Sequence, residues 1–177
     1  QWADWLSYEP LESSGGGAFH IGQNGRGPRP EALEYWNYLG ASYWMTDAGM
    51  MRDMAVATGR DVRKYEVMQD QARQYLKERF LTSDGLFKTA ILNTMQTPAL
   101  FALKNGLLEG QAKADMISRL RENFREHDNC LQTGFLGTSI LMNTLTDNGM
   151  SDIAYELLFQ RKNPSWLYSV DNGATTI

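Results

Sequence analysis

The sequence predicts an all-α protein of about three helical hairpins stacked side by side. Three observations carry this prediction. Glycine-centred junctions recur at a near-constant spacing, apolar residues follow the helical period, and strand signals are confined to a weak one at residues 86–91. With 177 residues, of which 42% are hydrophobic, the chain is long enough to form one globular domain with a core.

The three junctions are centred on Gly59, Gly106 and Gly149. Glycine readily takes the left-handed conformation that closes a helix, and an Asp or Ser after it can cap the next helix. The glycines lie 47 and then 43 residues apart. A period in this range, with helix–turn–helix content, is typical of stacked helical hairpins.

Each predicted hairpin pairs an apolar first helix with an amphipathic second one. Residues 30–58 are apolar on nearly all sides, which predicts a helix that is buried all round. Residues 61–80 place apolar side chains at i, i+3 and i+4, as expected of a helix lying over the first: Tyr65, Met68, Ala72, Tyr75, Leu76 and Phe80.

The second and third hairpins repeat this scheme. Thr97 and Pro98 have the form of an N-cap and a first helical residue, and the helix they open extends to Leu103. The other predicted helices cover residues 111–125, 137–146 and 151–160, whereas residues 13–30 and 163–177 are predicted to be non-helical. Apolar inner helices covered by amphipathic outer ones indicate a helical toroid or solenoid.

Composition limits the partners and the chemistry. A net charge of −4 disfavours nucleic acid, and no apolar run approaches the ~20 residues that span a bilayer, so we expect neither partner. Cys130 has no second cysteine to pair with and is predicted to be buried. His20, in the Gly-rich loop, is a candidate for ligand contact, and His127 is expected to be a capping or surface residue. Neither has zinc-ligand spacing, so we predict no metal and no cofactor.

Carboxylates are the remaining candidates. Asp4 lies between Trp2 and Trp5, an arrangement that can hold a sugar through aromatic faces and a hydroxyl acceptor. Alternatively, one of these tryptophans is core and Asp4 caps a turn. Asp47 and Asp53 are six residues apart and do not share a helix face, so we interpret them as structural carboxylates with partners.

Five blocks, in order, resemble the catalytic domain of the α-L-rhamnosidases, glycoside hydrolase family 78. They are residues 4–7 (Asp-Trp-Leu-Ser, after Ala where the family has Gly), 96–97 (Gln-Thr), 133–138 (Thr-Gly-Phe-Leu-Gly-Thr), 164–168 (Pro-Ser-Trp-Leu-Tyr) and 173–177 (Gly-Ala-Thr-Thr-Ile). The resemblance implies an (α/α)6 toroid, with residues 1–177 as a partial domain from its later portion. It also implies that Asp4, Trp5, Gln96, Thr133 and Phe135 lie near the sugar-binding end, with Trp5 stacking on a deoxysugar.

The resemblance further implies hydrolysis with inversion, by a Glu acid and a carboxylate base. In that family the acid precedes the block at 4–7 and the base follows the block at 173–177. We therefore assign no catalytic residue and expect the 177-residue chain alone to be inactive. Its implied partners are a rhamnose-containing glycan or glycoside and the rest of the catalytic domain, in the periplasm or outside the cell.

Two alternatives stay open at this point. One is a six-hairpin hydrolase or lyase with another substrate, and the other is a non-catalytic helical module that binds glycans or proteins. Because a partial toroid leaves apolar faces uncovered, we also expect the isolated chain to self-associate through exposed residues such as Trp36, Trp44 and Phe101.

Overall fold

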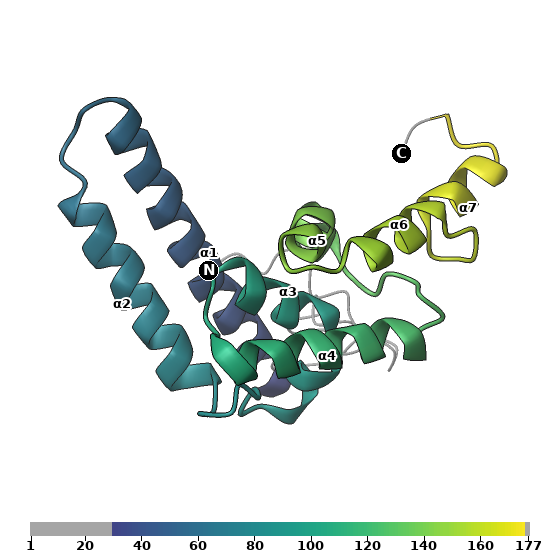
Figure 1. The fold of residues 1–177 in the computed structure, drawn as a ribbon, viewed down its shortest axis with the longest axis horizontal. Coiled ribbons are helices and arrows are strands. Elements are labelled where there is room, and N and C mark those ends of the chain that lie inside the picture. Colours follow the sequence, from purple (N-terminus) through teal and green to yellow (C-terminus); the bar gives the residue numbers. More distant parts are fainter. Residues whose placement is uncertain (1–29, 176–177) are drawn as a thin grey trace, which may run out of the picture.

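The computed structural model describes residues 30–175, and helices dominate this part of the chain (Figure 1). The helices are α1 (Pro30–Ala57), α2 (Arg63–Phe80), the 3-10 helix η3 (Ala90–Thr94), α3 (Gln96–Lys104), α4 (Gly110–Glu126), α5 (Phe135–Asp147), α6 (Ser151–Phe159) and α7 (Trp166–Asp171). Within the described residues, extended pairing is limited to one isolated bridge between Leu81 and Phe87. No helix there is long and apolar enough to cross a membrane.

The three glycine junctions close their helices in the same way. Gly59, Gly106 and Gly149 all have positive φ angles, of 66°, 57° and 73°. In each case the next residue donates its backbone N–H to a carbonyl five residues earlier, at 2.8 to 3.0 Å: Arg60 to Ala55, Leu107 to Ala102, and Met150 to Leu145. This is the hydrogen bond of the Schellman motif, so the predicted repeat is confirmed at the level of backbone geometry.

Capping of the following helices differs from the prediction. The N-cap residues of α2, α4 and α6 are Val62, Glu109 and Met150, and none of them makes a side-chain capping bond. Asp61 accepts a bond of 3.0 Å from the N–H of Arg63 without occupying the N-cap position. The prediction that an Asp or Ser caps each second helix is therefore wrong at these three helix starts.

The first helices of the three hairpins run side by side in the same direction. The Tyr38 hydroxyl, in the third turn of α1, donates to the carbonyl of Pro98, in the first turn of α3, at 2.9 Å. Further along, the Asn105 amide donates to the carbonyl of Ser42 at 3.1 Å. The start of α5 meets the start of α3, where Gly137 lies against Thr97. These contacts define an inner row of α1, α3 and α5, all of which begin at one end of the stack.

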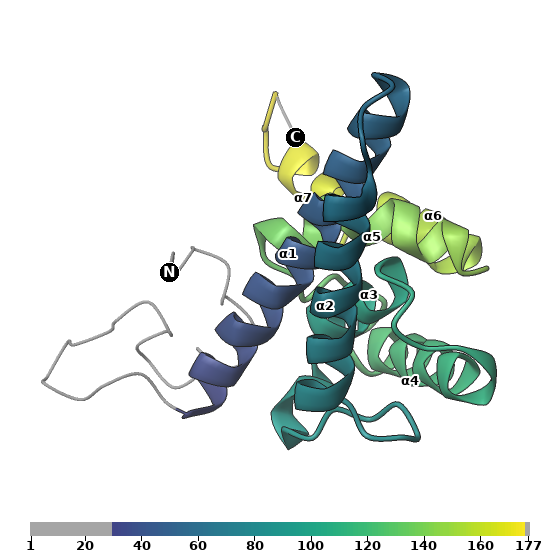
Figure 2. The same cartoon turned by 90° about the vertical axis from the view of Figure 1, so that its left-hand side faces the viewer.

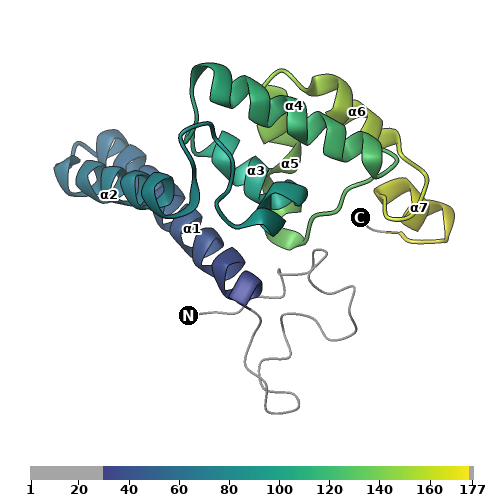
Figure 3. The same ribbon diagram turned by 90° about the horizontal axis from the view of Figure 1, so that it is seen from below.

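The second helices return along the outside of this row. The Asn123 amide of α4 donates to the carbonyl of Thr94 at 2.8 Å, beside the start of α3. Arg121 of α4 forms an ion pair with Asp152 of α6, and Figure 3 shows α4 and α6 along one edge with α3 and α5 beneath them. Figure 2 shows α1 alongside α2. The predicted three hairpins are thus confirmed.

The core lies between the inner and outer rows, and it corrects two predictions about exposure. Phe101 is fully buried and does not belong to an exposed face. The centroids of its ring and the Tyr43 ring are 5.2 Å apart. The helix α1 is not buried all round, since its side chains Leu33, Trp44, Met50, Met51, Met54 and Val56 are exposed. Asn105, directly after the end of α3, contacts Thr46, whereas α1 continues to Ala57. The last turns of α1 therefore extend beyond α3 and are not covered by it.

Two local details also differ from prediction, and a third agrees with it in part. The helix α7 lies within residues 163–177, which were predicted to be non-helical. Its N-cap Ser165 accepts a bond of 3.1 Å from the N–H of Tyr168, and its six residues are too few to show a period. The helix α3 begins at Gln96, with Met95 as its N-cap. The weak strand signal at 86–91 corresponds to the bridge at Phe87, followed by η3.

Candidate functional site

Three of the five predicted sugar-contact residues lie together where the inner helices begin. Gln96 is the first residue of α3, Phe135 is the first residue of α5, and Thr133 is in the segment leading into α5. The parallel inner row explains this grouping, because parallel helices place their starts at the same end. Asp4 and Trp5 lie outside the described residues, as does His20.

Gln96 is completely buried, and both ends of its amide are engaged. Its Oε1 accepts from the N–H of Gln132 at 2.7 Å, and its Nε2 donates to the carbonyl of Cys130 at 3.3 Å. A buried amide is costly unless it finds hydrogen-bond partners, and here its oxygen and its nitrogen each have one. The side chain therefore joins the start of α3 to the segment between α4 and α5.

The helices α3 and α5 approach very closely beside Gln96. A Cβ built on Gly137 would lie 2.3 Å from Oγ1 of Thr97 and 2.9 Å from Cβ of Thr133, so only glycine fits. The hydroxyls of Thr133 and Thr138 are 2.7 Å apart and share a hydrogen bond. Small residues in the block at 133–138 thus permit the contact, although the sequence did not reveal that Thr97 is its partner.

Phe135 is the most exposed large apolar side chain of the described part, with 75% of its surface accessible. Burying a phenyl ring is normally favourable, so a ring held in solvent at the end of a helix stack is a candidate for ligand contact. Two residues before Phe135, the Thr133 hydroxyl shares a hydrogen bond with that of Thr138 in the first turns of α5, which holds the start of the helix. An exposed ring on a fixed frame can stack against the C–H face of a sugar.

The described carboxylates form no catalytic pair at this end. Asp53 forms an exposed ion pair with the neighbouring Arg52 at 2.7 Å, which confirms the expectation of a structural partner. Asp47 is exposed on α1. Asp152 belongs to the α4–α6 contact, where hydrogen bonds from the Arg121 guanidinium hold the pKa of its carboxyl below the usual range. None of these three carboxylates is paired with a second carboxylate in the described part of the chain.

Other titratable groups have structural roles. His127 is the C-cap of α4, with Nδ1 2.7 Å from the carbonyl of Asn123, as predicted for a capping residue. Cys130 is buried as predicted, and burial, followed by the charge of Asp128, raises the pKa of its thiol. Burial also raises the pKa of the Tyr38 hydroxyl far above its ordinary value. Residues 30–175 contain no group of three or more His, Cys, Asp and Glu that could hold a metal ion.

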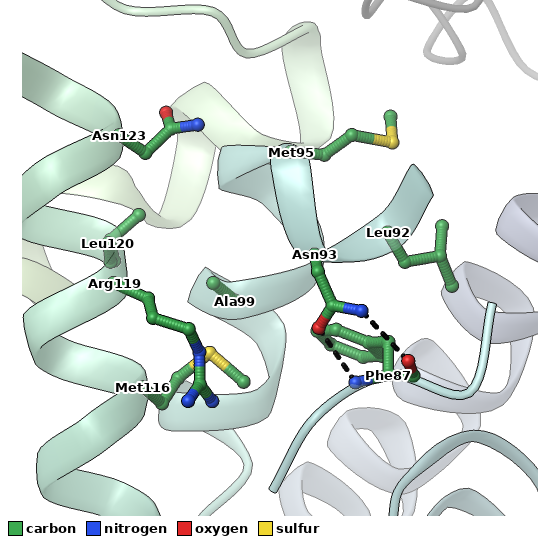
Figure 4. A pocket seen from close by; sticks show the side chains of 9 residues that line it. All are labelled: Phe87, Leu92, Asn93, Met95, Ala99, Met116, Arg119, Leu120 and Asn123. Carbon is green, nitrogen blue, oxygen red and sulfur yellow. Dashed lines mark hydrogen bonds between the residues drawn. The ribbon is translucent and has the colours of Figure 1, made fainter. Parts of the chain in front are cut away.

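Two hollows in the described part of the chain are formed by other residues. One, of about 10 Å³, lies between η3, α3 and α4 (Figure 4), and has room for about one water molecule. Beside it, Asn93 makes two bonds of 2.8 Å with the backbone of Phe87. The other is an open hollow of about 370 Å³ between the end of α2 and the start of α4, lined by Leu81, Leu108 and other residues. Neither contains a predicted site residue.

A row of parallel inner helices covered by antiparallel outer helices, built from three αα hairpins, is the arrangement expected of part of a six-hairpin domain. The family model of the bacterial alpha-L-rhamnosidase 6 hairpin glycosidase domain matches residues 1–177. The chain belongs to this family.

Curated relatives and solved structures agree with this assignment. The chain is 31% identical to an alpha-L-rhamnosidase of Formosa agariphila over 99% of its own length and 17% of the relative's, and 32% identical to one of an Alteromonas species over 98% and 18%. The crystal structure of Streptomyces avermitilis alpha-L-rhamnosidase complexed with L-rhamnose matches with a TM-score of 0.72 and 32% identity, over 79% of this chain and 13% of that one. The chain therefore spans less than a fifth of each of these relatives.

Proposed function

We propose that the chain forms part of the sugar-binding end of an inverting α-L-rhamnosidase. The observation that carries the proposal is the grouping of Thr133 and the exposed ring of Phe135 where α3 and α5 begin, with Gln96 beneath them. The chain is 32% identical to a Streptomyces avermitilis enzyme whose structure holds L-rhamnose. The proposed substrate is a glycan or glycoside with a terminal α-L-rhamnose.

Each site residue has a role suited to its chemistry. L-Rhamnose is a deoxysugar with a methyl group and several C–H bonds, so the Phe135 ring offers it an apolar wall. The Thr133 hydroxyl can donate or accept a hydrogen bond at the rim. Asp4 and Trp5 are proposed to complete the site as hydroxyl acceptor and stacking ring, and the remaining part of the catalytic domain is proposed to pack against this chain.

The proposed reaction leaves the chemistry to carboxylates outside residues 30–175. In an inverting glycosidase one carboxylic acid protonates the leaving oxygen, and a carboxylate on the other face activates water. The residues described here would hold the rhamnose ring between the two groups. Their contribution is orientation of the substrate, which lowers the barrier by placing the anomeric carbon correctly for both.

The test is a substrate panel with the natural full-length protein in which this chain occurs. Aryl α-L-rhamnoside should be hydrolysed, with release of the β-anomer first by NMR, whereas aryl β-glucoside and β-galactoside should not. Cleavage of another glycoside in preference to the rhamnoside would contradict the proposed substrate. Release of the α-anomer first would contradict inversion but not rhamnoside specificity.

A further inference from the structure

The segment between α4 and α5 holds an unusual shape through bonds to distant residues. Asp128 and Asn129 have positive φ angles of 56° and 52°, which few non-glycine residues adopt. Gln160, the C-cap of α6, donates to the carbonyls of both residues, at 3.0 and 3.3 Å. Nearer to α5, the bonds of Gln96 to Cys130 and Gln132 hold the same segment from the other side.

These anchors determine where the site residues emerge. Thr133 follows Gln132 directly, and Phe135 is three residues beyond it. With Gln132 held by Gln96, and α5 held against α3 at Gly137, the short connection has little freedom to change direction. The orientation of the Thr133 hydroxyl and the Phe135 ring therefore depends on the amide of Gln96.

We propose that Gln96 is a positioning residue, which fixes the segment at 130–134 so that Thr133 and Phe135 face the sugar, and that it does not contact the sugar itself. This inference rests on the function proposed above and sharpens the role of one residue in it. The side chain is fully buried, and its Oε1 and Nε2 are both engaged with backbone groups. It therefore acts on the ligand through the segment that it holds.

Two substitutions test this role in the full-length protein. Gln96→Leu removes both bonds and replaces the amide with an apolar side chain of comparable volume. Affinity for L-rhamnose should fall about tenfold, the effect expected when buried backbone groups lose their partners and the segment shifts. Hydrogen–deuterium exchange of a peptide covering residues 130–136 should become faster, while exchange in α2 should not change.

Gln96→Glu offers a conditional rescue that a merely apolar packing role would not produce. A protonated Glu has one donor and one acceptor and can replace both bonds, whereas a carboxylate cannot donate to Cys130. Burial favours the protonated form. The ratio of L-rhamnose affinity in this variant to that in the wild type should therefore rise as pH falls. Gln111→Glu is the control, because Gln111 is an exposed residue of α4 that bonds Asp115 at 2.8 Å; its ratio should stay flat.

The outcomes separate this inference from the proposed function. A Gln96→Leu protein that melts at a lower temperature but binds L-rhamnose as the wild type does would overturn the positioning role. A ratio of Gln96→Glu to wild-type affinity for L-rhamnose that does not change with pH would also overturn it. If wild-type protein binds no L-rhamnose, the proposed function fails. Exchange at residues 130–136 would then still decide whether Gln96 holds the segment.

Discussion

Gly137 of α5 lies so close to Thr97 of α3 that a single added carbon would reach within 2.3 Å of the Thr97 hydroxyl oxygen. This contact joins the starts of two inner helices, and it lies directly beneath the segment that carries Thr133 and Phe135. Helix packing at this distance requires that one side present only backbone. The geometry of the candidate site therefore depends on the absence of a side chain at one position.

We expect Gly137→Ala to destabilise the fold by about 1–3 kcal/mol, the usual cost of forcing an extra carbon into a filled contact. The matched control is Gly40→Ala in α1, where an added Cβ would meet nothing within 4 Å. Alanine is more favourable than glycine in a helix interior, so the free energy of unfolding of this control should rise by about 0.5–1 kcal/mol. Urea denaturation measures both, and equal effects of the two substitutions would contradict the close contact.

Phe135→Ala should weaken binding of L-rhamnose by the full-length protein without lowering its melting temperature, since the ring is 75% exposed and contributes little to the core. Phe159→Ala, which removes a ring that is 67% exposed on α6, should leave rhamnose binding unchanged. Isothermal titration calorimetry compares the two variants. Equal loss of affinity in both, or in neither, would remove Phe135 from the site.

The Arg121–Asp152 pair predicts a change in stability at acid pH. Arg121 contacts both carboxylate oxygens of Asp152, at 2.6 and 2.9 Å, and lowers the pKa of that carboxyl from its ordinary 3.8. A carboxyl with a lowered folded-state pKa stabilises the fold above its unfolded pKa, and this stabilisation is lost as pH falls through the lowered value.

Asp152→Asn should therefore cost stability at pH 7, by no more than about 1 kcal/mol because the pair is partly exposed. The difference from the wild type should shrink below pH 4. Asp70→Asn, at an exposed position of α2, is the control and should have little effect at either pH. A difference for Asp152→Asn that grows with acidity would reverse the assigned sign.

Self-association of the isolated chain remains a prediction, but the exposed apolar surface differs from the one that the sequence predicted. Met50, Met51 and Met54 form an exposed methionine patch where α1 extends past α3, whereas Phe101 is buried. Exposed apolar patches favour association. Met50→Glu with Met54→Glu should shift the sedimentation coefficient of the 177-residue chain toward that of a monomer. Gln74→Glu with Gln111→Glu adds the same charge elsewhere on the surface and should not. A wild-type chain that is monomeric at high concentration would contradict the prediction.

Local signals predicted the hairpins well because helix ends obey local rules. Gly59, Gly106 and Gly149 were identified from the sequence, and at all three junctions the residue after the glycine donates its N–H to the carbonyl five residues earlier. The short helix α7 was missed because it has too few turns to show a period. The burial of α1 was overestimated because an apolar surface does not reveal whether a neighbouring helix is long enough to cover it.

For the candidate site, the sequence motifs predicted which residues to examine, and the fold decided how each is used. Gln96 and Phe135 were singled out alike. Only the packing shows that they differ. The Gln96 amide is buried and bonds the backbone of residues 130 and 132, whereas the Phe135 ring is exposed to solvent. The sequence by itself determined the helical period, the junctions and the family, because these depend on residues near one another in the chain. The pairing of Thr97 with Gly137 joins residues 40 positions apart, and such a contact exists only once the helices have packed.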